Sequence, residues 1–318
     1  DAPYENMGTI QTKGWELAID YRHTFKNGLH FGVTASVADD KTEVTKWTYN
    51  TKIPSYGATG WWDKSAYKEG MVLGDIWGLQ FDRFLTEDDF NADGSLKAGL
   101  PDQTKVFPAG YQFAPGDVLY KDLDNNGEIV KQTNTNDKGD LSVIGNALPR
   151  LQFGLNLDAA WKGFDISMFF QGVAKRKLWA AGNQVLPGFT TGEPFYKGAE
   201  DYWTPENTDA FYPRPMDYKQ SASGNYSVND RYLLNMAYLR LKTFTVGYSL
   251  PKVWLSKFKV QGLRVYFTGE NLFTIDGVKP AIDPEIGIRT ASGKSDQRNF
   301  GRSYPYQKTV SFGIQLSL

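Results

Sequence analysis

Residues 151–161 read Leu-Gln-Phe-Gly-Leu-Asn-Leu-Asp-Ala-Ala-Trp. Every second side chain from Leu151 to Trp161 is apolar, and most side chains between them are small or polar. An alternation with a period of two is typical of a β-strand with one apolar face. A strand of about ten residues is also longer than the five or six residues usual in soluble sheets.

The same alternation recurs along the chain. It is found in residues 15–25, 29–37, 164–171, 238–250, 263–270 and 309–318. Within 238–250 the phase changes near Thr243 and Phe244, which predicts a β-bulge there. The chain is therefore expected to be all-β, with about seven long antiparallel strands.

The links between these strands are of two kinds. Three pairs are joined by short links: Lys26-Asn27-Gly28, Lys162-Gly163 and the somewhat longer stretch 251–262. Long polar segments, roughly 48–149, 178–235 and 275–303, separate the pairs, so all of them fall at the same end of the sheet. Long strands with short turns at one end and large loops at the other are typical of a transmembrane β-barrel.

A soluble β-sandwich is the alternative architecture, but its strands are usually shorter. Seven strands with an open edge would expose unpaired backbone groups to lipid. We therefore expect residues 1–318 to be the C-terminal part of a larger barrel, whose other strands lie upstream. The first residues, Asp1-Ala2-Pro3, contain neither an initiator Met nor an apolar signal segment, which favours a mature product or a fragment.

The composition excludes several classes of function. Lys and Arg number 35 against 36 Asp and Glu, and this balance lacks the basic footprint of a nucleic-acid-binding protein. Cysteine is absent, which excludes disulfides, thiolate zinc sites and cysteine nucleophiles. With His23 and His30 as the only histidines, little is left for His-based catalysis. The mean hydropathy is −0.47 although 15% of residues are aromatic, which fits strands with one polar face and polar loops.

Several ordered motifs resemble a known family. They are Asn6-Met7-Gly8, Gly14-Trp15-Glu16, Gly116-Asp117-Val118-Leu119-Tyr120-Lys121-Asp122-Leu123-Asp124, Asn126-Gly127, Ile144-Gly145-Asn146, Gly163-Phe164-Asp165-Ile166-Ser167, Trp203-Thr204-Pro205-Glu206-Asn207, Tyr238-Leu239-Arg240-Leu241-Lys242, Gly247-Tyr248-Ser249-Leu250-Pro251, Gly269-Glu270-Asn271-Leu272-Phe273-Thr274 and Asp283-Pro284-Glu285. In this order the chain resembles the C-terminal third of the SusC-like TonB-dependent transporters (SusC/RagA family) of the Bacteroidetes outer membrane.

The resemblance implies a 22-stranded barrel with an N-terminal plug. Residues 1–318 would supply strands 16 to 22 of that barrel, without the plug or the N-terminal strands. It also implies a location in the Gram-negative outer membrane, surrounded by lipid. The implied partners are a SusD-like surface lipoprotein that forms a lid, and the TonB complex, which acts through the plug.

The function that we expect is the import of nutrient oligomers, most of all glycans, without any bond chemistry. Import of peptides by the same mechanism is one alternative, and a soluble carbohydrate-binding or adhesin domain is another. A secreted glycosidase is the third, since Glu206 and Asp209 are loop carboxylates. The sequence does not indicate a second catalytic group placed beside Glu206 or Asp209, so we expect no catalytic residues. We also expect no required cofactor.

Residues 122–129 match the first half of a calcium-binding loop. Asp122, Asp124 and Asn126 offer oxygens at its positions 1, 3 and 5, Gly127 follows at position 6, and Glu128 offers a carbonyl at position 7. Position 12 is Thr133 rather than a bidentate Glu, so Asp137 or Asp140 would have to replace it. The alternative is a tight Asp/Asn/Gly turn without an ion.

Aromatic side chains in the long segments are candidates for substrate contact, because an aromatic face stacks on the apolar face of a sugar ring. The first candidates are Trp61, Trp62, Trp179 and Trp203, accompanied by Trp47, Trp77, Tyr202, Phe211 and Tyr212. The alternative is that they pack the loops together or meet a lid protein, since interfaces are enriched in Trp and Tyr.

Charged side chains on the polar face of the strands form a third set. They are Glu16, Asp20, Arg22, Asp158, Asp165, Arg240, Lys242, Arg264 and Glu270. We expect them to hydrate the lumen of the barrel and to pair with the plug or with one another.

Overall fold

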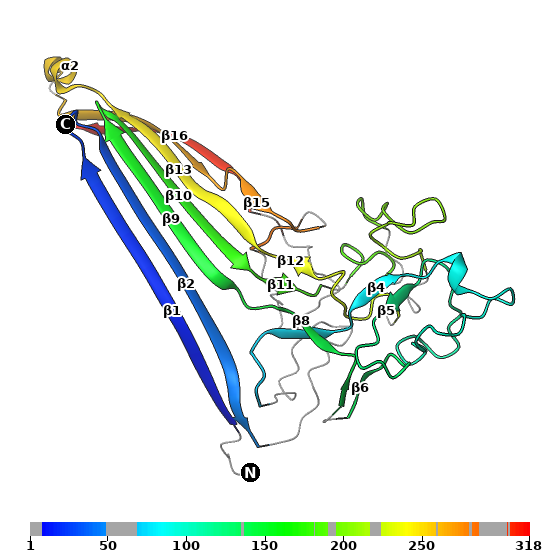
Figure 1. Ribbon diagram of the computed structural model, residues 1–318. Helices are drawn as coiled ribbons and strands as arrows, with labels where there is room; N and C mark the ends of the chain where they lie inside the picture. Colours follow the sequence, from blue (N-terminus) through cyan, green and yellow to red (C-terminus); the bar gives the residue numbers. More distant parts are fainter. Residues whose placement is uncertain are drawn as a thin grey trace, which may run out of the picture.

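The computed structural model describes residues 8–48, 69–134, 137–180, 182–189, 195–216, 224–258, 260–279, 282–285, 304 and 306–318. Its main element is a tilted antiparallel sheet whose long strands pair in chain order (Figure 1). These strands are β1 (Gly8–Thr24), β2 (His30–Trp47), β9 (Arg150–Trp161), β10 (Phe164–Lys175), β13 (Tyr238–Ser249), β14 (Gly262–Glu270) and β16 (Thr309–Ser317). The short strand β15 (Thr274–Asp276) pairs with the start of β13. The structure thus confirms an all-β chain with seven long strands.

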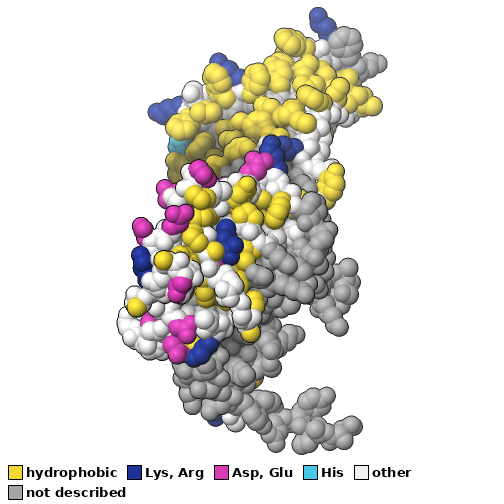
Figure 2. Space-filling model, turned by 90° about the vertical axis from the view of Figure 1, so that its right-hand side faces the viewer, with side chains coloured by type: hydrophobic (Ala, Val, Ile, Leu, Met, Phe, Trp, Pro, Cys, Tyr) yellow, Lys and Arg dark blue, Asp and Glu magenta, His cyan; other side chains and the backbone are white. Residues whose placement is uncertain are grey.

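One face of this sheet is apolar across nearly its whole width. The register aligns Phe31, Ala159, Ile166, Val246, Phe267 and Phe312 in one row from β2 to β16. The adjacent row on the opposite, polar face consists of Gly32, Asp158, Ser167, Thr245, Thr268 and Ser311. The apolar face is not a protein core, since Phe312 is 84% exposed and Ile19 is 56% exposed. Figure 2 shows hydrophobic side chains gathered over the part of the molecule that the long strands form.

The links lie where the sequence places them. Lys162 and Gly163 both have positive φ, 48° and 89°, as a two-residue type I′ hairpin turn requires. The third link contains α2 (Lys252–Leu255) and η2 (Ser256–Phe258). All three links and the C-terminus lie at one end of the sheet, and the described parts of the long segments lie at the other (Figure 1). Among the described residues, no helix is long and apolar enough to cross a bilayer.

Two details of the strands go beyond the sequence pattern. The register shifts between Phe169 and Phe170 of β10 and passes over Lys242 of β13, which confirms the bulge expected near Thr243. The β1–β2 hairpin is longer than the alternation indicates, since it begins at Gly8 and ends at Trp47. The added residues, such as Thr42 and Glu43, are polar on both faces and therefore carry no period of two.

The long segments are not open loops. Described residues of 69–148 and 177–235 fold together into what we call the loop domain (Figure 1). Its elements are β3 (Asp75–Gly78), β4 (Phe81–Phe84), η1 (Glu87–Asp89), β5 (Val118–Tyr120), β6 (Lys131–Asn134), β7 (Asp137–Gly139), β8 (Ser142–Asn146), β11 (Lys177–Leu178) and β12 (Leu234–Asn235). Two hydrophobic clusters form its core, one containing Trp179 and the other containing Trp203.

Candidate functional site

A buried carboxylate connects the two segments of the loop domain, residues 69–148 and residues 177–235. Asp117, just before β5, is fully buried and accepts hydrogen bonds from Tyr111 Oη (2.8 Å), Arg214 Nε (2.8 Å) and Asn225 Nδ2 (2.9 Å). Arg214 and Asn225 belong to the second long segment, about a hundred residues away in the chain. A buried charge is tolerated where it is paired and hydrogen-bonded in this way.

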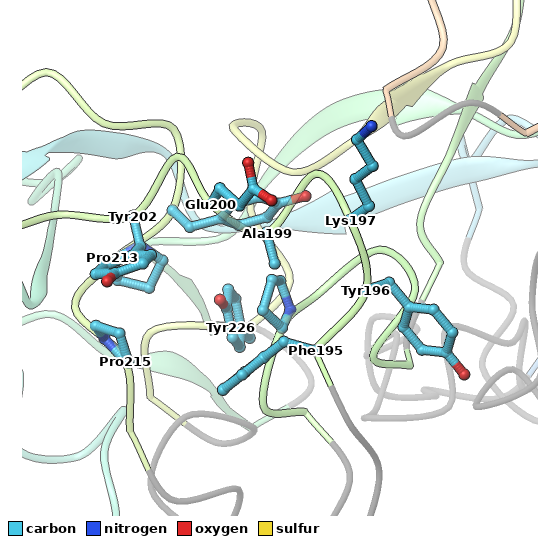
Figure 3. Close-up of a pocket in the computed structure, with 11 residues that line it drawn as sticks. Phe195, Tyr196, Lys197, Ala199, Glu200, Tyr202, Pro213, Pro215 and Tyr226 are labelled. Atoms are coloured by element: carbon cyan, nitrogen blue, oxygen red, sulfur yellow. The ribbon is translucent and has the colours of Figure 1, made fainter.

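Next to this connection, the second segment forms a pocket with a cavity of about 670 Å³. Its lining is rich in aromatic and proline side chains, namely Phe195, Tyr196, Tyr202, Tyr212, Tyr226, Pro187, Pro213 and Pro215, and includes the charged residues Lys197 and Glu200. Figure 3 shows Pro213 and Pro215 on one side of the cavity, with Phe195 and Tyr226 on the other. Its volume is in the range of small-ligand sites.

The aromatic side chains of this pocket differ in exposure. Tyr212 and Tyr226 are 5% and 4% exposed, whereas Phe195 and Tyr202 are 58% and 40% exposed. The Tyr212 hydroxyl donates to Val185 O at 3.0 Å, and burial raises the pKa of Tyr212 to about 12, so this hydroxyl stays neutral. The pocket therefore offers a fixed aromatic floor and exposed rings for stacking. The sequence already marks Tyr202 and Tyr212 as loop aromatics, but Phe195 and the prolines give no such signal.

The tryptophan candidates lie in other places. Trp179 is 1% exposed and Trp203 is 6% exposed, each inside one of the two hydrophobic clusters. Trp203 packs against Gly116, where φ is +90° and a Cβ would lie 2.5 Å from the indole. This burial favours the packing role that the sequence left open. Trp61 and Trp62 lie outside the described residues.

Three carboxylates meet at the expected calcium loop. Ligand oxygens of Asp122, Asp124 and Asp140 all lie within 4.8 Å of one another. Asp140 comes from the far end of the same loop, and its two oxygens accept backbone N–H groups of Leu123 and Val130, both at 2.8 Å. Asp122 Oδ2 accepts from Gly127 N at 2.8 Å, while its buried Oδ1 has no hydrogen-bond partner among the described residues. Asp140, one of the two residues expected to complete the loop, belongs to this cluster, whereas the side chain of Asp137 lies outside the described part of the structure.

Glu128 and Asn126, the other two residues expected at the calcium site, form contacts of their own. Glu128 forms an ion pair with Lys105, outside the three-carboxylate cluster. The Asn126 side chain bridges the turn, since Nδ2 donates to Asp124 Oδ2 (3.1 Å) and Oδ1 accepts from Glu128 N (2.7 Å). The contribution expected from Glu128 is its backbone carbonyl rather than its carboxylate, and that contribution stays a prediction.

The electrostatics of the cluster suit a hard cation. Burial and the negative charges of Asp140 and Asp122 raise the pKa of Asp124. For Asp122, burial acts in the same direction, but the N–H of Gly127 and other hydrogen bonds outweigh it and lower the pKa. Carboxylate oxygens held close together are the ligands that Ca²⁺ prefers.

Comparison with known proteins finds similar chains along nearly the whole length of the sequence. No protein-family model matches the chain. Over 324 residues it is 26% identical to TonB-dependent receptor P3 of Formosa agariphila, covering 98% of the chain and 29% of that receptor. With TonB-dependent receptor SusC of Bacteroides thetaiotaomicron it shares 22% identity, covering 99% of the chain and 27% of SusC. Over nearly its whole length the chain is similar to proteins named TonB-dependent receptors.

The fold agrees with this family. The solved structure of the RagAB peptide transporter superimposes on 98% of the chain with a TM-score of 0.64 at 17% identity, and the match covers 30% of the RagAB chain. A RagAB structure in an open-open state gives the same TM-score at 18% identity. The chain thus spans about 30% of the length of the TonB-dependent receptors that it matches. These homologues are receptors and transporters rather than enzymes, in line with the expectation of no catalysis.

Proposed function

We propose that this chain forms part of the wall and outer loops of an outer-membrane β-barrel that imports nutrient oligomers. The observation that carries the proposal is the sheet, in which seven long strands share one exposed apolar face and the described parts of the long segments follow the strands at one end. A lipid-facing wall with a polar lumen needs this arrangement, because backbone groups are satisfied between strands and the apolar face meets lipid. The strands would be strands 16 to 22 of the barrel.

For the substrate we propose glycan oligomers, with peptides as the alternative. The support for glycans is the pocket of the loop domain, in which Phe195 and Tyr202 present exposed rings beside Lys197 and Glu200. Rings of this kind stack on sugars while charged neighbours bond hydroxyls. The alternative draws on RagAB, which is described as a peptide transporter and shares the fold.

Import by such a barrel would need further components. By resemblance to the family these are an N-terminal plug, the TonB complex acting on it, and a SusD-like lipoprotein that closes the outer end. The loop domain lies at the end of the sheet where that lid would sit (Figure 1). A structural calcium ion at Asp122, Asp124 and Asp140 would brace the loop domain, and no other cofactor is proposed.

The proposal is tested in a strain that carries the whole transporter. The protein should fractionate with the outer membrane and need detergent for extraction, and its deletion should abolish growth on one class of oligomer. Phe195→Ala with Tyr202→Ala should slow uptake of that oligomer at least five-fold. Trp254→Ala is the matched control, since this ring is also exposed but lies in α2 at the opposite end. Recovery of the protein in the aqueous fraction would instead support the soluble binding domain.

A further inference from the structure

A second cavity, of about 390 Å³, lies on the polar face of the sheet at the end near the loop domain. Its lining includes Gln152 of β9, Gln171 of β10, Tyr238 and Lys242 of β13, Arg176 and Glu285. The register explains why these side chains meet. Gln152 pairs with Val173, Val173 pairs with Tyr238, and Gln171 lies two residues before Val173 on the same face. We call this cavity the polar recess.

Among the described residues, the charges around the polar recess do not balance. Arg240 pairs with Asp283 and Glu285, and Lys242 pairs with Glu285. Together with Arg176, these residues give three cations against two carboxylates, a net charge of +1 (3 − 2 = 1). The unbalanced cation is Arg176.

Arg176 is held in place by neutral groups alone. Its Nε donates to Ala147 O at 3.2 Å and its Nη1 to Pro284 O at 3.4 Å. Among the residues that the structure describes, no carboxylate forms an ion pair with Arg176, and its Nη2 has no hydrogen-bond partner. Burial lowers the pKa of Arg176, because desolvation disfavours its charged form.

We propose that the polar recess binds a carboxylate carried by the transported oligomer, with Arg176 as its counter-ion. The inference rests on the proposed import function and deepens it by naming a chemical feature of the substrate. The free edge of a guanidinium matches the two oxygens of a carboxylate, and the bonds to Ala147 and Pro284 fix that edge in advance. The exposed amides of Gln152 and Gln171 supply hydrogen bonds for hydroxyl or peptide groups next to the carboxylate. A uronic acid and a peptide C-terminus present the same chemistry.

The test measures binding by the purified whole transporter in detergent, with paired probes that differ only in charge. One pair is trigalacturonic acid and its methyl ester, and the other is tetra-alanine and its C-terminal amide. In at least one pair, the acid should bind at least ten-fold more tightly than its neutral partner at low salt. Arg176→Gln should reduce this ratio to less than two-fold, and Arg176→Lys should retain most of it. The pair that shows the effect identifies the source of the carboxylate.

Lys175→Gln is the matched control, because Lys175 is an exposed cation next in sequence that does not line the polar recess. It should keep the full ratio. A shared loss in Lys175→Gln and Arg176→Gln, or equal binding of acid and neutral probes by the unmodified protein in both pairs, would overturn the inference. Uptake in cells is measured separately. Normal uptake together with equal binding of acid and neutral probes would refute carboxylate binding in the polar recess but not the proposed import function. Tighter binding of the acid probes without uptake in cells would refute the proposed import function.

Discussion

Arg240 and Glu285 lie 45 positions apart in the chain, yet the Arg240 guanidinium donates from Nη1 to Glu285 Oε2 at 2.7 Å. Nη2 of the same side chain donates to Asp283 Oδ1 at 2.8 Å, and Nε donates to Thr274 Oγ1 at 2.7 Å. The side chains of Arg240, Asp283 and Glu285 are 4%, 6% and 10% exposed. This buried network connects β13 with the segment that follows β15.

Replacing Arg240 should release that segment. Arg240→Met leaves two buried carboxylates without their main partner, a change that costs about 3–5 kcal/mol where both charges are buried. We expect residues 274–285 to exchange amide hydrogens at least a hundred-fold faster, as measured by hydrogen–deuterium exchange. Arg264→Met is the control, since the Arg264–Asp165 pair is 28% and 35% exposed and lies within the strands. Unchanged exchange in Arg240→Met would contradict the fastening role.

The sequence contains both ends of this network but not their contact. Tyr238–Lys242 and Asp283–Glu285 stand out as motifs, and parity places Arg240 on the polar face. Period-two alternation also predicts all seven long strands, because each strand has one apolar face and one polar face. Alternation does not predict which side chains pair between distant segments. The contact of Arg240 with Asp283 and Glu285 depends on how the chain folds after β15.

The loop domain was beyond prediction for the same reason. Its strands are two to five residues long, too short to show any period. The pocket joins residues from both sides of position 200, and Asp140 joins Asp122 only because the loop between them folds back. Local patterns therefore identified Asp122 and Asp124 and offered Asp140 as one of two further candidates, whereas its place beside them required the fold.

The two faces of the edge strand β16 offer a test of lipid contact. Phe312→Arg places a charge on the apolar face, and in membrane barrels this costs about 2–4 kcal/mol near the bilayer midplane. Ser311→Arg, one residue away, places the same charge on the polar face. The amount of folded transporter in the outer membrane, measured by heat-modifiable mobility on gels, should fall several-fold for Phe312→Arg only. Equal loss in both variants would argue against a lipid-facing side.

Asp117 should hold the two halves of the loop domain together. Asp117→Asn removes the charge that Arg214 faces, and leaving a half-buried guanidinium unpaired costs about 3 kcal/mol. We expect proteolysis of the segments around Arg214 and Asn225 to accelerate at least ten-fold, with the strands unaffected. Asp93→Asn is the control, because Asp93 is an exposed turn residue whose carboxylate accepts hydrogen bonds from Ser95. A protease pattern identical to that of the unmodified protein would refute this role.

The Arg83–Asp89 pair predicts an acid-sensitive part of the loop domain. Hydrogen bonds from Arg83 hold the pKa of Asp89 at about 2, below its ordinary value. A depressed pKa contributes stability above the ordinary value, and that stability is lost as the pH falls towards about 2. Amide exchange of residues 81–97, corrected for its intrinsic pH dependence, should accelerate between pH 4 and pH 2. In Asp89→Asn the pH step should vanish, and its persistence would assign the step to another group.

Calcium at Asp122, Asp124 and Asp140 is the remaining proposal to be tested. Calcium should raise the midpoint of thermal unfolding of the loop domain, because an ion that binds only the folded state stabilises it by mass action. The effect should weaken as the pH falls, since the pKa of Asp124 is raised and protons compete for its oxygens. Asp124→Asn and Asp140→Asn should each remove the calcium-dependent shift. Glu128→Gln should retain it, because Glu128 pairs with Lys105 instead. A midpoint that does not respond to calcium or chelator in the unmodified protein would leave the cluster as a hydrogen-bonded turn.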